Sequence, residues 1–130
     1  MKKILSLVAA LAFAATSAVA GEFPDISIEE LESHIKKGDV TILDVNGSKS
    51  YSKGHIPGAL DFAKSGKKLK SLLPKDKDAL VVAYCGGPSC SAYKRAANAA
   101  EKLGYTNVKH LSAGISGWLQ ASKKTEKAAN

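Results

Sequence analysis

Two stretches of the chain are almost continuous runs of apolar and β-branched residues, Val40–Val45 and Ala79–Tyr84. Runs of this length and kind are typical of strands that are buried on both faces of a parallel sheet. Val108–Leu111 predicts a third strand and Ala59–Phe62 a short fourth one. The pattern therefore predicts a sheet whose two faces are both covered.

Apolar residues at helical spacing separate these strands. Ser27-Ile28-Glu29-Glu30 is a capping box, and it predicts a helix that begins at Ile28 and ends at Gly38. An alanine stripe predicts a second long helix over Ser91–Leu103. Shorter helices are predicted at Lys67–Leu73 and Ile115–Gln120, and a loop over residues 46–58. Alternating strands and helices indicate an α/β fold with a central, mainly parallel β-sheet flanked by helices on both faces.

The N-terminus has the pattern of a secretory signal peptide. Met-Lys-Lys is followed by an apolar run from Ile4 to Ala15, and Ala18 and Ala20 form a small-x-small cleavage site. The run is shorter than the roughly 20 residues that span a bilayer. We expect cleavage after Ala20, one domain over residues 21–121, a flexible basic tail over residues 122–130, and a periplasmic or secreted location. Beyond the signal peptide we expect no membrane association.

The positive charge of the chain does not indicate a nucleic-acid site. The whole chain has a formal net charge of +7, and removing Lys2 and Lys3 leaves +5. Arg95 is the only arginine, whereas proteins that read nucleic acids rely on the forked contacts of arginine. The lysines are scattered or gathered in the tail, so we expect a solvated basic surface, no nucleic-acid partner and a monomer.

The residues after the second predicted strand form the candidate site, Tyr84-Cys85-Gly86-Gly87-Pro88-Ser89-Cys90-Ser91. Reactive groups of parallel α/β sheets lie at the carboxyl ends of the strands, where Cys85 is placed. Inward N–H groups of the turn and the positive end of the following helix both favour a thiolate at Cys85. A thiolate attacks sulfur donors, and the same N–H groups, from Gly86, Gly87, Ser89, Cys90 and Ser91, could cradle the anionic persulfide.

The sequence is compatible with two roles for Cys90. Only five positions separate it from Cys85, so a bridge between them would close a loop too small to stabilise the fold greatly. Cys90 could act as a resolving thiol that attacks an oxidised or persulfurated Cys85, or it could be a small packing residue. The oxidising compartment favours the first role.

A few further polar residues could support the site. Asp44 ends a strand at the same sheet edge as Cys85, where it could orient the loop by hydrogen bonding or cap a helix. Arg95 lies further along the helix that follows the loop. His34, His55 and His110 lie in three different elements without the spacings of zinc sites, so we expect no metal and no cofactor.

Several of these segments resemble the rhodanese domain family. They occur in the family's order: Asp44-Val45 closing a strand, Gly54-His55-Ile56-Pro57-Gly58-Ala59, Tyr84-Cys85 opening a short loop, and Gly114-Ile115-Ser116-Gly117-Trp118. The resemblance covers residues 25–121 and implies an α/β fold in which Cys85 is the sulfur-accepting nucleophile and residues 85–90 are the active loop. It implies a structural role for His55. The chain departs from the family at Asn46, where an arginine is common, and its loop contains no basic residue.

From these features we expect an exported, single-domain rhodanese-type sulfurtransferase. Cys85 would take sulfane sulfur from a small donor (thiosulfate, a persulfide or a polysulfide) and pass it to a thiol or cyanide-like acceptor. The alternatives are a thiol–disulfide or oxidant-responsive protein that uses the Cys85/Cys90 pair, and a non-catalytic module that binds sulfur or a partner.

Overall fold

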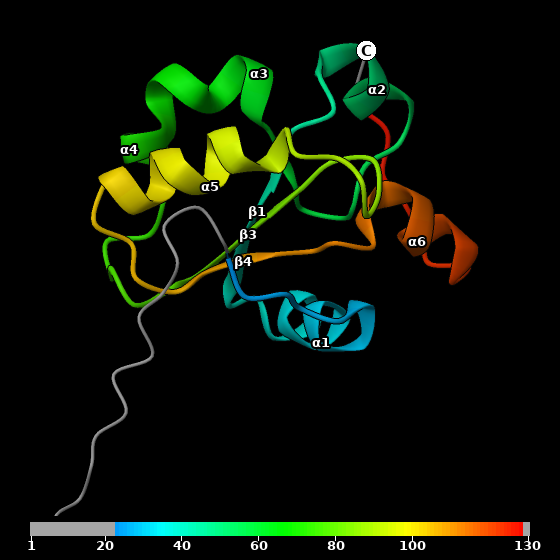
Figure 1. Ribbon diagram of the computed structural model, residues 1–130, viewed down its shortest axis with the longest axis horizontal. Helices are drawn as coiled ribbons and strands as arrows, with labels where there is room; N and C mark the ends of the chain where they lie inside the picture. The colour runs from blue at the N-terminus through cyan, green and yellow to red at the C-terminus, as the bar shows by residue number, and fades with distance from the viewer. Residues whose placement is uncertain (1–22, 129–130) are drawn as a thin grey trace, which may run out of the picture.

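The computed structural model describes residues 23–128 of the chain, which fold as a parallel sheet between two layers of helices (Figure 1). The predicted signal peptide, residues 1–20, lies outside the described residues. The α/β fold with a central parallel sheet is confirmed. Within residues 23–128, no helix combines the length and the apolar character that crossing a membrane requires.

The sheet has four parallel strands in the order β2-β1-β3-β4. These strands are β1 (Val40–Asp44), β2 (Leu60–Asp61), β3 (Leu80–Tyr84) and β4 (Val108–His110). β1 and β3 pair from Val40 with Leu80 to Asp44 with Tyr84. Because β1 and β3 occupy the middle of the sheet, their residues are covered on both faces, which explains their continuous apolar runs.

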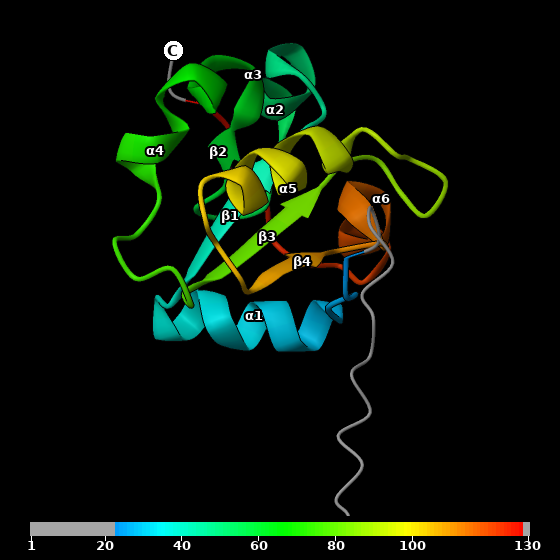
Figure 2. The same ribbon diagram turned by 60° about the vertical axis from the view of Figure 1, so that its left-hand side comes forward.

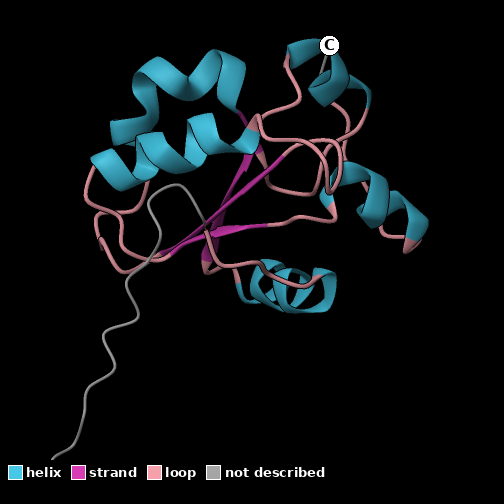
Figure 3. Ribbon diagram, in the orientation of Figure 1, coloured by secondary structure: helices cyan, strands magenta, loops and turns pink. Residues whose placement is uncertain are grey.

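The helices cover the two faces of the sheet (Figure 2). On one face lie α3 (Phe62–Ser65), the 3₁₀ turn η1 (Gly66–Lys68), α4 (Leu69–Leu72) and α5 (Tyr93–Lys102). On the opposite face lie α1 (Ile28–Lys37) and α6 (Gly114–Gln120), and α2 (Ser48–Lys53) lies near the carboxyl ends of the strands. Figure 3 shows the magenta strands running between these two layers.

Alternate residues of β3 enter two separate hydrophobic clusters. Val81, Ala83 and the following Cys85 belong to the cluster under α5, whereas Val82 and Tyr84 belong to the cluster beneath α1 and α6. This two-residue period places the Cys85 side chain on the α5 face and the Tyr84 side chain on the opposite face.

The prediction of a loop over residues 46–58 is wrong for its central part, which forms α2. The sequence of α2, Ser-Lys-Ser-Tyr-Ser-Lys, carries one large apolar side chain and so has no helical stripe. Tyr51 supplies the anchor: its hydroxyl donates to the Ala59 carbonyl at 2.7 Å and its ring stacks on His55. Tertiary contacts therefore stabilise a helix that the hydrophobic pattern does not indicate.

The predicted tail, residues 122–130, is described as far as residue 128, and residues 122–128 contact the domain. Glu126 and His55 exchange two backbone hydrogen bonds of 2.9 Å, and the Trp118 indole Nε1 donates to the Lys124 carbonyl at 2.8 Å. Lys123 pairs with Glu32 of α1 at 3.0 Å. These contacts could not be inferred from the lysine-rich composition, because most of them are made by backbone atoms.

Candidate functional site

The centre of the candidate site is Cys85, the first residue after β3. Its side chain is buried, with 1% of the residue exposed. The last pair of β1 and β3 is Asp44 with Tyr84, and Val45 N–H donates to the Tyr84 carbonyl at 2.9 Å, so Val45 and Cys85 directly follow two adjacent strand ends. The structure thus places Cys85 at the sheet edge that the sequence indicated.

Cys85 and Cys90 form a disulfide bond, with their Cα atoms 6.3 Å apart. The bond joins the first residue of the loop to the residue that the sequence singled out as a resolving thiol. The described form is therefore the oxidised one, in which neither sulfur is a nucleophile. The structure thus brings together the two cysteines that the sequence indicated.

The carbonyl groups at the start of the loop are bound by the N-terminus of α6. Ile115 N–H donates to the Cys85 carbonyl and Ser116 N–H donates to the Gly86 carbonyl, each at 3.0 Å. These two N–H groups belong to the first turn of α6, where a helix has no internal acceptors for them. The contact satisfies both partners and fixes the orientation of the Cys85–Gly86 backbone.

The N–H groups of the same loop remain available. Across residues 23–128, none of the backbone N–H groups of Gly86, Gly87, Ser89 and Ser91 has a hydrogen-bond acceptor. The Cys90 N–H differs, because it donates to the Gly87 carbonyl at 3.1 Å and closes a turn around Pro88. Of the five N–H groups that the sequence predicts as a cradle, four therefore have no acceptor among residues 23–128 in the disulfide-bonded form.

Gly114 explains how α6 comes so close to the loop. It has φ +61°, and a Cβ at this position would lie 2.6–2.7 Å from backbone atoms of Cys85, Gly86 and Gly87. Only glycine fits such a contact, and it adopts positive φ without the steric cost that other residues pay. The absence of a side chain at Gly114 therefore allows the first turn of α6 to contact the Cys85–Gly87 backbone directly.

Asp44 takes the hydrogen-bonding role rather than the capping role. Its Oδ1 accepts from Asn46 N–H at 2.8 Å and its Oδ2 accepts from the Tyr84 hydroxyl at 2.5 Å. The Tyr84 hydroxyl in turn accepts from Ile56 N–H at 3.1 Å. This chain joins the ends of β1 and β3 to the Gly54–Ala59 segment, on the sheet face opposite the Cys85 side chain.

The surroundings of Tyr84 keep its hydroxyl protonated. Burial raises the pKa of Tyr84 far above its usual value of 10.0, and the negative charge of Asp44 raises it further. The hydroxyl therefore remains a donor to Asp44 throughout the neutral range. The residue next to Cys85 is a fixed structural support rather than an acid or base.

The helix that the sequence predicts from Ser91 begins two residues later in the structure. α5 begins at Tyr93, its N-cap position is Ala92, and no side chain of residues 23–128 caps it. Ser91 accepts from Lys94 N–H through its backbone carbonyl instead. The loop is therefore longer by two residues than the sequence suggested.

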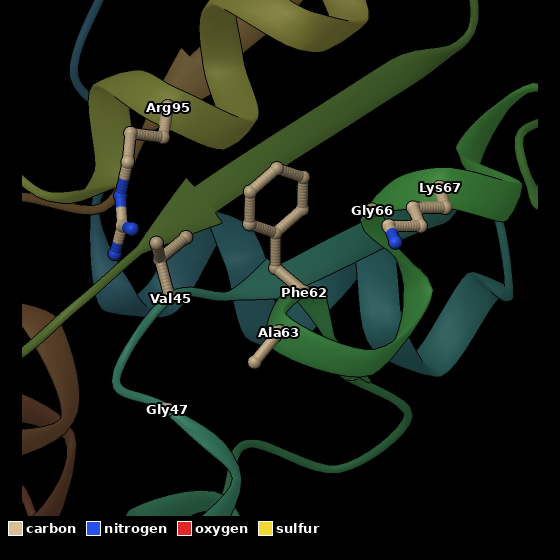
Figure 4. Close-up of a pocket in the computed structure, with 7 residues that line it drawn as sticks. All are labelled: Val45, Gly47, Phe62, Ala63, Gly66, Lys67 and Arg95. Carbon is tan, nitrogen blue, oxygen red and sulfur yellow. The ribbon is translucent and has the colours of Figure 1, made fainter.

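A cavity of about 290 Å³ lies on the α5 face of the sheet, between Arg95 of α5 and the segment that contains α3 and η1 (Figure 4). Arg95, the supporting residue predicted from the sequence, lines it together with Lys67, which the sequence analysis did not single out. The remaining lining residues are Val45, Gly47, Phe62, Ala63 and Gly66. Lys67 was missed because it belongs to a lysine-rich stretch distant from Cys85 in sequence, and only the fold brings that stretch to Arg95.

The three histidines lie apart in the fold. His34 bonds Asp39, and His55 stacks on Tyr51 and contacts the Tyr51 carbonyl at 2.8 Å. His110 is buried and stacks on Tyr93. In the part of the chain that the structure describes, no three histidine, cysteine, aspartate or glutamate side chains gather as metal ligands would.

Comparison with known proteins agrees with this architecture. Among solved structures, the rhodanese-like domain of the Anabaena protein Alr3790 superposes with a TM-score of 0.64 at 25% identity, covering 82% of this chain and 81% of that domain. A thiosulfate sulfurtransferase from Pseudomonas aeruginosa gives a TM-score of 0.65 at 25% identity, covering 82% of this chain and 20% of the enzyme.

Sequence comparison gives the same result. An HTH-type transcriptional regulator of Mycobacterium tuberculosis, Rv0324, is 32% identical over 121 residues, which are 92% of this chain and 52% of the regulator. The chain thus spans about half the length of that relative. The profile of the rhodanese-like domain matches residues 27–121, which include every element from α1 to α6. This chain therefore belongs to the rhodanese-like domain family.

Proposed function

We propose that the protein is an exported sulfurtransferase that carries sulfane sulfur as a persulfide on Cys85. The observation that supports this most concerns the loop backbone: α6 binds the Cys85 and Gly86 carbonyl groups, while four N–H groups of the loop have no acceptor among residues 23–128. N–H groups without partners at a cysteine stabilise a thiolate and then a persulfide anion.

The oxidised loop must first be reduced. A dithiol reductant donates two electrons to the Cys85–Cys90 bond, becomes a disulfide itself and leaves two protein thiols. The Cys85 thiolate then attacks the outer sulfur of a donor R–S–SH. The sulfur–sulfur bond of the donor breaks, its electron pair leaves with RS⁻, and Cys85 retains the outer sulfur as a persulfide.

The second half of the cycle returns the enzyme to its starting state. An acceptor thiolate attacks the outer sulfur of the Cys85 persulfide, the bond between the two sulfurs breaks, and the Cys85 thiolate is released. If Cys90 attacks Cys85 instead, HS⁻ leaves and the disulfide forms again. The disulfide is then the product that forms when no acceptor thiol removes the sulfur from Cys85.

Export is part of the proposal and is supported by the signal-peptide pattern of residues 1–20. A periplasmic or secreted location would account for a disulfide between neighbouring cysteines. Mass measurement of the protein recovered from the exporting cell should give a chain that begins at Gly21. A recovered chain that retains its first 20 residues would count against export.

Mass spectrometry of the reduced protein tests the proposed chemistry. After treatment with thiosulfate, glutathione persulfide or polysulfide, Cys85 should gain one sulfur atom. This gain should vanish in Cys85→Ala and persist in Cys90→Ser. A protein that loads no sulfur from any of the three donors is not a sulfurtransferase of this type.

A second function is favoured by the disulfide itself: a thiol–disulfide or oxidant-responsive protein that uses Cys85 and Cys90. The same experiment separates the two functions. Because Cys90 can also remove the sulfur from the wild-type protein, the comparison is made in Cys90→Ser. Loss of two hydrogen atoms in the wild type together with no sulfur adduct in Cys90→Ser indicates redox chemistry and not sulfur transfer.

A further inference from the structure

The cavity lined by Arg95 lies on the face of the sheet that carries the Cys85 side chain. Val45, which lines the cavity, donates its N–H at 2.9 Å to the carbonyl of Tyr84, the residue before Cys85. Val45 and Cys85 both belong to the hydrophobic cluster under α5, against which Phe62 and Cys90 also pack. A molecule in this cavity would therefore lie against Val45, on the same side of the sheet as the Cys85 side chain.

The charge of the cavity is positive. Arg95 and Lys67 contribute the only ionised side chains among its seven lining residues. Neither forms an ion pair with any carboxylate of residues 23–128, whereas Lys36, Lys109 and Lys123 all do. The two free cations are suited to an anionic ligand, and the guanidinium of Arg95 offers the forked geometry that a carboxylate accepts.

The walls between the cations are apolar. In the view of Figure 4, Val45 and Phe62 lie between Arg95 and Lys67. An inorganic oxyanion such as thiosulfate has no apolar part to place against these side chains. The volume of about 290 Å³ is close to the lower end of the range for sites that bind small organic molecules.

We infer that this cavity binds the organic part of the sulfur donor, and that the donor is an organic persulfide with a carboxylate group. Arg95 binds the carboxylate, Lys67 adds positive charge, and Val45 and Phe62 contact the carbon chain. The outer sulfur is then presented to Cys85, which takes it while the RS⁻ group stays in the cavity until it dissociates. This inference rests on the proposed function.

The test uses the full chain in reduced form and compares three donors. Glutathione persulfide carries two carboxylates, its diethyl ester carries none, and thiosulfate is inorganic. We expect a KM for glutathione persulfide at least tenfold below that for the diester. Arg95→Gln should raise the KM for glutathione persulfide by about tenfold, as expected for loss of a charged hydrogen bond, with little change in the maximal rate.

Control variants lie next to the two cations in sequence. Lys94→Gln and Lys68→Gln remove the same charge from positions that do not line the cavity. We expect both to leave the KM for glutathione persulfide within about twofold of the wild-type value, because exposed charges act weakly at a distance. Lys67→Gln should raise it by a few-fold.

Binding of S-methylglutathione, measured by titration calorimetry, provides a readout that needs no sulfur transfer. This thioether should bind the wild-type protein and lose at least tenfold in affinity in the double variant Arg95→Gln/Lys67→Gln. Unchanged affinity in that variant, or equal KM values for the acid and the diester, would overturn the inference and leave the proposed function standing. If Cys85 loaded no sulfur from any donor, the proposed function would fall and the donor role of the cavity with it.

Discussion

The Asp44 carboxylate accepts a 2.5 Å hydrogen bond from the Tyr84 hydroxyl beneath the ends of β1 and β3. Both residues are almost fully buried, at 1% and 0% exposure. A buried carboxylate without hydrogen-bond donors is costly, so this pair keeps Asp44 compatible with the interior. It also fixes the position of the residue that immediately precedes Cys85.

Tyr84→Phe should therefore destabilise the protein. The variant removes the donor to Asp44 Oδ2 and the acceptor of Ile56 N–H at once. We expect the free energy of unfolding to fall by about 2–4 kcal/mol, because hydrogen bonds to charged groups contribute more than neutral ones. Urea denaturation of the reduced proteins measures this change.

Tyr51→Phe is the matched control. The Tyr51 hydroxyl donates to a neutral carbonyl, that of Ala59, at 2.7 Å and is only half-buried. Its loss should lower the free energy of unfolding by about 1 kcal/mol. If the two variants were equally stable, the charge of Asp44 would have no special part in the stability of the site.

Gly114→Ala should displace α6 from the active loop. The added Cβ would lie within 2.7 Å of the Cys85 carbonyl and of the Gly86–Gly87 peptide, and alanine would be strained at φ +61°. Overpacking and a left-handed backbone together should lower the free energy of unfolding by about 2–5 kcal/mol. Sulfur loading of Cys85 should slow as well, since the loop carbonyls lose their fixed partners.

The control for this variant lies in the same loop. Gly87→Ala would place its Cβ 3.9 Å from the nearest atoms of Ser116, an ordinary contact. We expect a change of less than about 1 kcal/mol in the free energy of unfolding. A Gly114→Ala protein as stable as Gly87→Ala would show that α6 does not depend on this close approach.

The sequence predicted the parts of the fold whose burial determines their composition. β1 and β3 were identified because burial on both faces leaves a continuous apolar run, and α1 because Ser27 caps it, accepting from Glu30 N–H at 3.0 Å. α2 was missed because its stability comes from Tyr51 and not from a stripe of apolar residues. The hydrophobic pattern therefore identifies helices and strands that bury one whole face. It does not identify a helix such as α2, which is stabilised by the contacts of one side chain.

The candidate site was predictable to the same extent. The position of Cys85 follows from the strand that ends before it, and the contact with Cys90 from their short separation. The support by α6 could not be derived from composition, since Ile115 and Ser116 act through backbone N–H groups. Nor could the presence of Arg95 and Lys67 in the lining of one cavity, which depends on how α3 and η1 pack beside α5.

Cys90→Ser should protect the protein from oxidative inactivation. In the wild-type protein a Cys85 that becomes oxidised or carries a persulfide can be attacked by Cys90, to which the structure shows it bonded. Without that thiol the intramolecular disulfide cannot form, so sulfur loading should survive mild peroxide or aerobic storage and recover without a dithiol reductant. Activity before and after such treatment measures the effect.

The initial activity of reduced Cys90→Ser should equal that of the reduced wild type, because serine keeps the size of the side chain. Equal loss of activity in both proteins after peroxide would show that oxidation of Cys85 alone inactivates the protein. Cys90 would then be a packing residue, the other role that the sequence left open.

His110 should make the stability of the protein depend on pH below neutrality. Its imidazole is 8% exposed, stacks on Tyr93, and its Nε2 has no hydrogen-bond partner among residues 23–128. Burial lowers the pKa of His110 below its usual 6.5; the charge of Lys94 lowers it further, and that of Asp25 opposes the change. The folded protein therefore binds this proton less readily than the unfolded chain does.

The sign of the effect follows from that difference. Above pH 6.5 the histidine is neutral in both states and its contribution to stability is complete. As the pH falls below 6.5 the unfolded chain takes up the proton first, so the free energy of unfolding decreases. Between about pH 7.5 and pH 5, His110→Phe, which keeps an aromatic ring against Tyr93, should lose less stability than the wild type. His34→Gln, a change at a more exposed imidazole, serves as the control, and parallel pH profiles for wild type and His110→Phe would mean that His110 does not resist protonation in the folded state.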